Sequence, residues 1–257
     1  VWVAGTGLVI FAGQKGVDFF GDLWAFDPDS SRWRKLPAAG GAPKARYGSC
    51  MIVGRDGRVW ISHGFTFSGR FDDTRAYNFG TERWSSIAPD GRRPGERCLH
   101  DCWTSSSGEL VLYGGQDNDA RSLGDLWVTR KNGNWKRQDD PRPRARRLYA
   151  VTEAGDFAYV FGGADKADKK LDDVWRVDRT THRFKRLRVE GNGPSARSAG
   201  TLVTDAARGR LLLFGGEGAS AKADLWELVD RAAADESDDT ATATSSPEPS
   251  AEAATED

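Results

Sequence analysis

Residues 110–137, LVLYGGQDNDARSLGDLWVTRKNGNWKR, decide the fold of this 257-residue chain. The stretch holds a short apolar run that ends in a Gly pair, then a polar loop, an Asp-Leu-Trp triplet, a turn and a further Trp. Short apolar runs broken by Gly are typical of strands rather than helices. We therefore expect strands joined by turns.

The same unit recurs five times with a period near 50 residues, which is the signature of a repeat architecture. Four markers keep a constant order along the chain. They are the second residue of the Gly pair (Gly13, Gly64, Gly115, Gly163, Gly216), an aromatic after an Asp (Trp24, Tyr77, Trp127, Trp175, Trp226), a second aromatic (Trp33, Trp84, Trp135, Phe184) and Pro-x-x-Arg (ending at Arg46, Arg97, Arg146, Arg197). Such an arrangement does not arise by chance.

Each unit predicts four short strands. In the second unit we expect them at residues 47–53, 58–62, 75–79 and 83–87, with a hairpin turn at Gly57. Gly108, Gly155 and Gly209 predict the same turn in later units. Large aromatics suit the space between stacked sheets, and sheets stacked around an axis make a β-propeller.

Gly-Gly, Asp-Leu-Trp, a later Trp and Pro-x-x-Arg together resemble the kelch repeat over residues 1–230. The resemblance implies an all-β kelch β-propeller of four-stranded antiparallel blades, the propeller that galactose oxidase also has. Kelch propellers usually have six or seven blades. Five repeats are visible here and both ends are short of strands, so we expect an incomplete propeller or part of a larger one. The chain opens on Val1 without a signal peptide, which indicates processing or a longer parent chain.

Residues 231–257 differ in composition from residues 1–230. They contain eight acids and one base, which leaves 30 acids and 36 bases, about +6, in residues 1–230. Because they have no apolar residue larger than Ala, we expect a disordered acidic tail rich in Ser, Thr, Ala and Pro. The basic charge of residues 1–230 forms no run, so nucleic-acid binding is not expected. No apolar stretch approaches the roughly 18 residues of a membrane helix.

Cys50, Cys98 and Cys102 are the three cysteines. Cys98 and Cys102 would lie roughly 13 Å apart on one strand, too far for a disulfide. The odd number predicts free thiols, which favours a reducing compartment such as the cytoplasm.

The sequence contains no clear set of metal ligands for an enzyme. His100 lies beside Cys98, Asp101 and Cys102, but a second pair of zinc ligands at finger-like spacing is missing. Copper oxidases and iron-dependent specifier proteins with this propeller need Tyr/His or carboxylate/His sets. The loop carboxylates, at Asp117, Asp119, Asp165 and Asp168, lack a His. A galactose-oxidase-like copper or iron enzyme is therefore the alternative function, and we expect no catalytic residue, metal or cofactor.

Loops between second and third strands emerge together at one end of a propeller, which we call the loop mouth. They are residues 14–21, 65–72, 116–124, 164–171 and 218–223. Their sequences vary while the framework repeats, as is typical of binding loops on a rigid scaffold. Aromatics with Arg are common interface anchors. The candidates on these loops are Phe67, Arg70, Phe71, Asn118 and Arg121. In the other interpretation, the aromatics tuck against neighbouring blades.

The resemblance also implies that kelch modules bind partners through Arg residues before the first strands, here Arg46, Arg97, Arg146 and Arg197. A ring of Arg favours acidic segments through bidentate pairing. Alternatively, each Arg pairs with a carboxylate of its own or the neighbouring blade. We predict a non-catalytic scaffold that binds a protein or peptide partner, including acidic ones, at the loop mouth.

Overall fold

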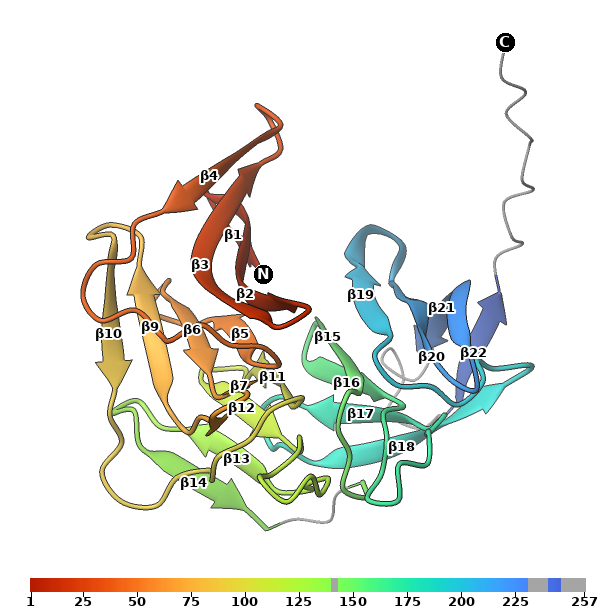
Figure 1. Ribbon diagram of the computed structural model, residues 1–257. Coiled ribbons are helices and arrows are strands. Elements are labelled where there is room, and N and C mark those ends of the chain that lie inside the picture. Colours follow the sequence, from red (N-terminus) through yellow and green to blue (C-terminus); the bar gives the residue numbers. More distant parts are fainter. Residues whose placement is uncertain (140–142, 231–239, 246–257) are drawn as a thin grey trace.

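The computed structural model describes residues 1–139, 143–230 and 240–245 of the chain, and its strands form the five four-stranded blades of a propeller, the last two of which are joined edge to edge into one eight-stranded sheet (Figure 1). The predicted all-β fold of antiparallel kelch blades is confirmed. The strands lie within a few residues of the predicted positions. In the described part of the chain, no helix is long and apolar enough to cross a membrane.

The blades follow one another along the chain. Blade 1 contains β1 (Trp2–Val3), β2 (Gly7–Lys15), β3 (Asp18–Asp27) and β4 (Arg32–Leu36). Blade 2 contains β5 (Cys50–Val53), β6 (Val59–Ser62), β9 (Thr74–Asn78) and β10 (Arg83–Ile87), with a small hairpin of β7 (Phe65–Thr66) and β8 (Gly69–Arg70). Blade 3 contains β11 (Asp101–Thr104), β12 (Leu110–Tyr113), β13 (Leu126–Thr129) and β14 (Trp135–Gln138).

Blade 4 contains β15 (Ala150–Ala154), β16 (Phe157–Phe161), β17 (Val174–Asp178) and β18 (Phe184–Glu190). Blade 5 contains β19 (Thr201–Asp205), β20 (Arg210–Glu217), β21 (Ala221–Asp230) and β22 (Thr240–Ser245), with a single 3-10 turn, η1 (Ala206–Arg208).

The last strand lies beyond the predicted domain boundary at residue 230. β22 pairs antiparallel with β21 and parallel with β18, so it completes blade 5 from within the predicted acidic tail. The sequence did not predict this strand, because it consists of small residues. Strand pairing uses the main chain and needs no large side chain. The rest of the predicted tail lies outside the described residues.

The core lies between the blades. Separate apolar clusters join blade 1 to 2, blade 2 to 3, blade 3 to 4 and blade 4 to 5. Alternation along each strand sends successive side chains to opposite faces, which lets one sheet pack on both neighbours. In β2, for example, Val9 is buried against blade 2 while Leu8 and Ile10 on the other face are exposed.

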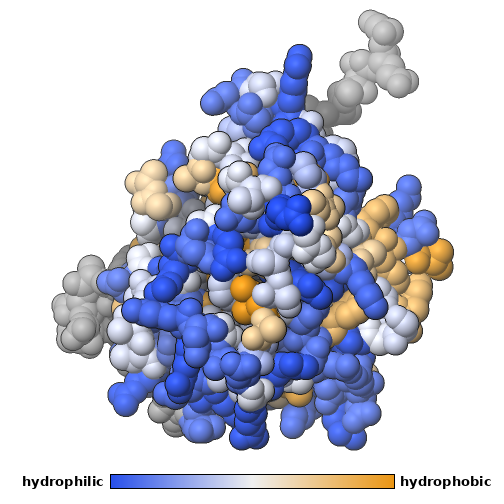
Figure 2. Space-filling view, turned by 90° about the vertical axis from the view of Figure 1, so that its left-hand side faces the viewer, coloured by the Kyte–Doolittle hydropathy of each residue, from blue (hydrophilic) through white to orange (hydrophobic). Residues whose placement is uncertain are grey.

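The two end blades each leave one apolar face exposed. Trp2, Leu8 and Ile10 are exposed on blade 1, and Val203 and Phe214 are exposed on blade 5. The face of the molecule shown in Figure 2 is mainly hydrophilic, with its hydrophobic side chains gathered in a few groups. Face-to-face stacking of blades therefore stops at blades 1 and 5 within the described residues.

The glycine markers sit where the backbone needs them. Both residues of the pair have positive φ, for example 62° at Gly114 and 97° at Gly115, and an added Cβ at Gly115 would lie 2.8 Å from the Cys98 carbonyl oxygen. Ala12 and His63 replace the first glycine in blades 1 and 2 and keep its left-handed conformation. The predicted hairpin glycines also have positive φ, as only Gly adopts readily.

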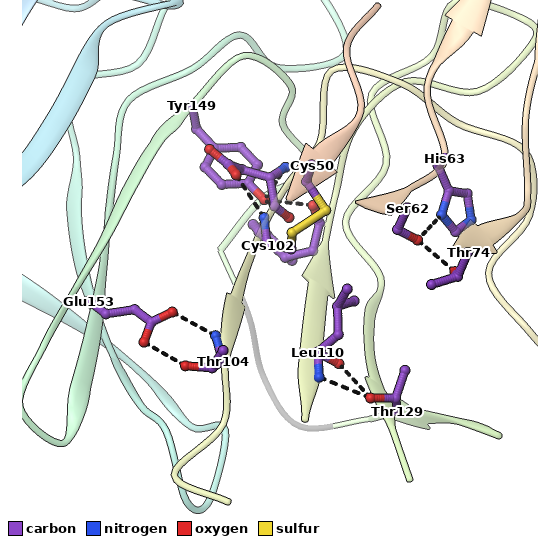
Figure 3. The surroundings of a disulfide bond; sticks show 12 residues. Cys50, Ser62, His63, Thr74, Cys102, Thr104, Leu110, Thr129, Tyr149 and Glu153 are labelled. Atoms are coloured by element: carbon purple, nitrogen blue, oxygen red, sulfur yellow. Dashed lines mark hydrogen bonds between the residues drawn. A yellow bond between two sulfur atoms is a disulfide. The ribbon is translucent and has the colours of Figure 1, made fainter. Parts of the chain in front are cut away.

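The cysteine prediction is wrong for two of the three residues. Cys50 on β5 and Cys102 on β11 form a disulfide, with their Cα atoms 5.8 Å apart, and it links the inner strands of blades 2 and 3 (Figure 3). Only Cys98 is a free thiol, and it is buried. The cytoplasmic expectation rested on three free thiols and loses that support, because disulfides are typical of oxidising compartments.

Candidate functional site

The four motif arginines are buried, and each forms a bidentate ion pair with an Asp of its own blade. The pairs are Arg46–Asp73, Arg97–Asp125, Arg146–Asp173 and Arg197–Asp224. In blade 3, Nη1 and Nη2 of Arg97 lie 2.7 and 2.9 Å from the two Asp125 oxygens. Nη1 also donates to the Gly114 carbonyl, and Nε donates to the Gly95 carbonyl. The structure therefore has the second of the two predicted arrangements, own-blade pairing.

The main chain of each motif Arg joins its blade to the preceding one. The Arg97 carbonyl accepts from the Gly64 amide, and the Arg97 amide donates to the Phe71 carbonyl, both in blade 2. Arg46, Arg146 and Arg197 repeat both contacts. One residue thus holds its own blade through the side chain and the previous blade through the backbone, which explains why the motif recurs.

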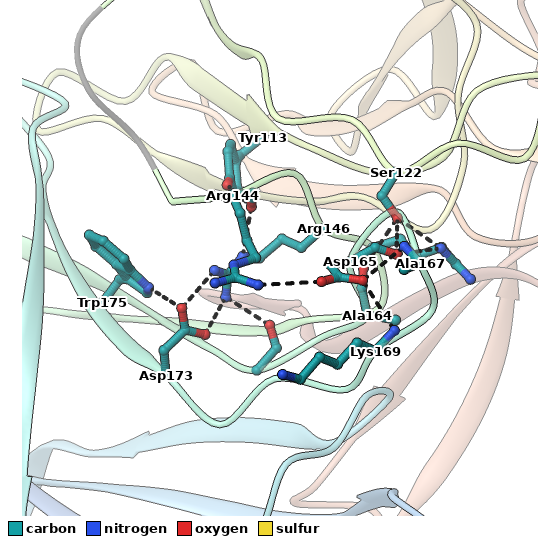
Figure 4. A network of polar contacts seen from close by, with 12 residues as sticks. Tyr113, Ser122, Arg144, Arg146, Ala164, Asp165, Ala167, Lys169, Asp173 and Trp175 are labelled. Carbon is teal, nitrogen blue, oxygen red and sulfur yellow. Dashed lines mark hydrogen bonds and ion pairs between the residues drawn. The ribbon is translucent and has the colours of Figure 1, made fainter.

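In blades 3 to 5 the Asp of each pair also accepts a hydrogen bond from a Trp indole. Around Arg146, the Trp175 indole N–H donates to Asp173, which is paired with Arg146 (Figure 4). Burial alone would raise the pKa of Asp173, but the hydrogen bonds and charge of Arg146 outweigh it and keep that pKa below its usual value. The Asp is therefore ionised at neutral pH and neutralises the Arg.

In blade 2 the structure differs from the sequence prediction at the aromatic that follows the Asp. At the position of the Trp in the other blades stands Arg75, whose Nε donates to Asp73 as the indole does elsewhere. Tyr77 lies two residues further along β9 and packs on Trp84 instead. The structural equivalent of Trp127 is therefore Arg75 and not Tyr77.

The loop mouth carries an aromatic cluster made by blades 1 and 2. Phe19 packs edge-on against Phe65 and Phe67, with ring centroids 5.8 and 4.9 Å apart, and Tyr47 packs on Phe65 at 5.7 Å. Phe67 is 69% exposed and Tyr47 39% exposed. We call Phe19, Tyr47, Phe65 and Phe67 the aromatic mouth cluster. In this cluster Phe19 and Phe65 are packed against other rings, whereas Phe67 and Tyr47 are accessible to solvent.

Sequence analysis missed Tyr47 as a candidate. It directly follows Arg46, and its segment pairs with the loop at Phe65. The residues that follow the other motif arginines, Cys98, Arg147 and Ser198, make the same kind of bridge to their own loops. The position after each motif Arg thus lies beside a mouth loop. A residue that directly follows the Pro-x-x-Arg motif can therefore be predicted from the sequence to lie near the mouth.

The other predicted loop residues divide into two groups. Arg70 reaches from blade 2 to blade 3, where it donates to Gln116 at 2.8 Å and contacts Cys98 and Asn118. Asn118 is exposed and also donates to Glu96, while Arg121 is 70% exposed beside Asp119. Phe71, by contrast, lies over the Arg46 guanidinium at 4.2 Å from its ring centroid. Phe67, Arg70, Asn118 and Arg121 therefore gather at the mouth, whereas Phe71 covers a scaffold pair.

An axial cavity of about 390 Å³ lies where all five blades meet. Its lining includes Phe11, Ser49, Asp101, Tyr149 and Gly200, one residue from each blade. Burial raises the pKa of Asp101 to about 7, and its carboxylate accepts the Cys102 amide. The Tyr149 hydroxyl binds the Asp101 main chain rather than its carboxylate.

The histidines form no metal site with the residues described. His63 and His100 are buried side by side, 5.5 Å between ring centroids, and Nδ1 of His63 hydrogen-bonds to Ser62 (Figure 3). Burial and Arg97 lower the pKa of His100 to about 3. No group of three or more His, Cys, Asp or Glu able to hold a metal occurs in residues 1–139, 143–230 and 240–245.

The comparisons with known proteins agree with this geometry. The KLHDC2/KLHL20/DRC7 Kelch-repeats domain model matches residues 1–115 and 90–253. The chain is 30% identical over 146 residues to Kelch domain-containing protein 2 of Bos taurus, covering 53% of this chain and 34% of the relative. It is 26% identical over 230 residues to Kelch domain-containing protein 1 of Mus musculus, covering 76% and 55%.

A further relative is the Rab9 effector protein with kelch motifs of Gallus gallus. It is 27% identical over 199 residues, which cover 74% of this chain and 52% of the relative. The chain thus spans between a third and just over half of the length of these relatives.

Proposed function

This chain belongs to the kelch-repeat family, and from that premise we propose that it is a non-catalytic interaction module that binds a partner protein or peptide at its loop mouth. One relative is, by its name, a Rab9 effector protein with kelch motifs. The proposal places the contact on the side chains that vary between blades and leaves the repeated residues as scaffold.

The aromatic mouth cluster is the observation that carries the proposal. Phe67 is 69% exposed, yet its contact with Phe19, which itself packs on Phe65, limits the conformations it can adopt. A preorganised aromatic loses little entropy on binding and offers a large apolar area. Such residues are typical energetic centres of protein interfaces.

Charged groups on the loops of blades 2 and 3 supply the specificity. Arg70 is held by Gln116, and Arg121 extends from the blade 3 loop into solvent. We assign to these two residues an acidic group on the partner, because guanidinium binds carboxylates in a fixed two-pronged geometry. Arg46, Arg97, Arg146 and Arg197 have carboxylate partners within their own blades, so they act by holding the mouth in shape.

Matched substitutions test the proposal. Phe67→Ser and Arg121→Ser should each reduce capture of partner proteins from a lysate, quantified by mass spectrometry, without changing the Tm. Trp2→Ser is the control for Phe67, since Trp2 is similarly exposed at 62% and lies outside the mouth. Arg208→Ser is the control for Arg121, because both are about 70% exposed and pair with a local Asp. Equal capture by mouth and control variants would refute the mouth as the site.

A further inference from the structure

The fourth strand of each blade carries a large aromatic at one fixed register, except in blade 5. The aromatic pairs with the residue four positions after the Asp that recurs in each repeat: Asp22, Asp73, Asp125 and Asp173. The pairs are Trp33 with Phe26, Trp84 with Tyr77, Trp135 with Thr129 and Phe184 with Val177. In blade 5 the same register pairs Ala243 with Leu228. A methyl group thus stands where the other blades place a ring.

The rings of blades 2 to 4 pack against the preceding blade. Trp84 of blade 2 lies in the cluster shared with blade 1, Trp135 of blade 3 in the cluster shared with blade 2, and Phe184 packs on Trp103 of blade 3. Trp33 of blade 1 has no preceding blade among the described residues and is 48% exposed. A ring at Ala243 would therefore pack between blades 4 and 5.

A cavity of about 590 Å³ lies at that place. Phe161 and Leu187 line it from blade 4, Leu213, Trp226 and Leu228 line it from blade 5, and Ala243 lines it from β22. Ala243 is 6% exposed, so its methyl group faces the protein but fills little of the space. A ring at residue 243 would enter this cavity, and the cavity is larger than one aromatic side chain.

Beside the cavity, the main chains of β18 and β21 both pair with the strand that lies between them. β22 pairs with β21 over residues 241–245 and with β18 over residues 240–242. These bonds do not depend on side-chain identity, so any extended segment can make them, as in peptide recognition by strand addition. The sequence of β22 is TATATS, in which Ala is the largest apolar residue.

We propose that the slot between β18 and β21 is a binding site for an extended segment of a partner protein with an aromatic residue at the Ala243 register. That segment replaces β22, makes the same main-chain bonds and fills the cavity with its ring. β22 then acts as a weak internal occupant that keeps the edges of β18 and β21 covered until the partner binds. The site is separate from the loop mouth and does not depend on it.

Two peptides test the proposal with the intact chain. One has the β22 sequence with Trp in place of Ala243, TATWTS, and the other is the parent TATATS. Calorimetry should show that the Trp peptide binds at one site, at least about tenfold more tightly than the parent. Thr242→Pro should strengthen this binding, because Pro removes an amide from β22 and weakens the internal competitor. Equal binding of the two peptides, or no binding of either to Thr242→Pro, would overturn the proposal.

Ala243→Trp provides the matching test within the chain. The new ring should fill the cavity, raise the Tm and abolish binding of the Trp peptide, whereas Phe67→Ser at the mouth should leave peptide binding unchanged. A lower Tm together with unchanged peptide binding would contradict the cavity as the site. Sedimentation gives the remaining check: a dimer that Ala243→Trp dissociates would identify a second copy as the occupant and refute a foreign segment.

Discussion

Arg97 and Asp125 lie 28 residues apart and form a bidentate ion pair in which the guanidinium is 2% exposed. The Arg97 main chain also holds blade 2, so this single residue connects two sheets. Because the pair recurs in blades 2 to 5, charge pairing near the mouth is part of the framework of the propeller.

Arg97→Ala should therefore destabilise the chain strongly. The substitution leaves Asp125 partly buried without its counter-charge, and breaking a buried pair in this way costs about 3–5 kcal/mol. Arg121→Ala is the control, since its exposed pair with Asp119 is worth about 0–1 kcal/mol. Urea denaturation measures both values, and similar losses for the two variants would show that the buried pairs are not structural.

Reduction of the Cys50–Cys102 disulfide should also lower stability. The bond closes a loop between residues 52 positions apart, and such a link contributes roughly 2–4 kcal/mol. Dithiothreitol should lower the Tm of the native chain and of Cys98→Ala, but not that of the double variant Cys50→Ala/Cys102→Ala.

Thiol labelling checks the same assignment independently. Burial raises the pKa of the Cys98 thiol, so it should react only after unfolding. The unfolded chain should then expose one thiol before reduction and three after it. Three reactive thiols without reductant would contradict the disulfide.

The sequence predicted the blades well because their markers act locally. The Gly pair, the Asp and the paired aromatics each shape one sheet, so spacing alone locates them. Two sequence clues to longer-range features were present but indirect. Cys50 and Cys102 are one repeat apart, which places them on adjacent inner strands, and Tyr47 follows a motif Arg that faces the mouth.

Other features had no clear sequence signal. Arg75 replaces a Trp because guanidinium and indole N–H groups can both donate to the same Asp, so a search for aromatics selects the wrong residue. β22 uses main-chain pairing and small residues, which resemble a solvated tail in composition. The aromatic mouth cluster forms between two blades, so it depends on how the sheets stack rather than on either loop alone.

The adjacent residues His100 and Asp101 should give the stability of the chain two opposing dependences on pH. Burial raises the pKa of Asp101 to about 7, whereas an unfolded Asp titrates near about 3.9. Between these values the unfolded state loses a proton that the folded state keeps, so this group's stabilising contribution is lost as the pH rises from about 4 to 7. His100 acts oppositely: its pKa falls to about 3, and its contribution is lost as the pH falls below about 6.5.

Single substitutions at these two residues should separate the two effects. Asp101→Asn keeps an oxygen for the Cys102 amide and removes the titration. Its stability relative to the parent chain should therefore increase between pH 4 and 7, by at most about 1.4 kcal/mol per pH unit. His100→Gln should show the reverse trend, with its relative stability increasing as the pH falls from about 6.5 towards 4. Denaturant titrations at pH 4.5, 5.5 and 6.5 measure both trends. Parallel pH profiles for the two variants would mean that neither group titrates as its burial requires.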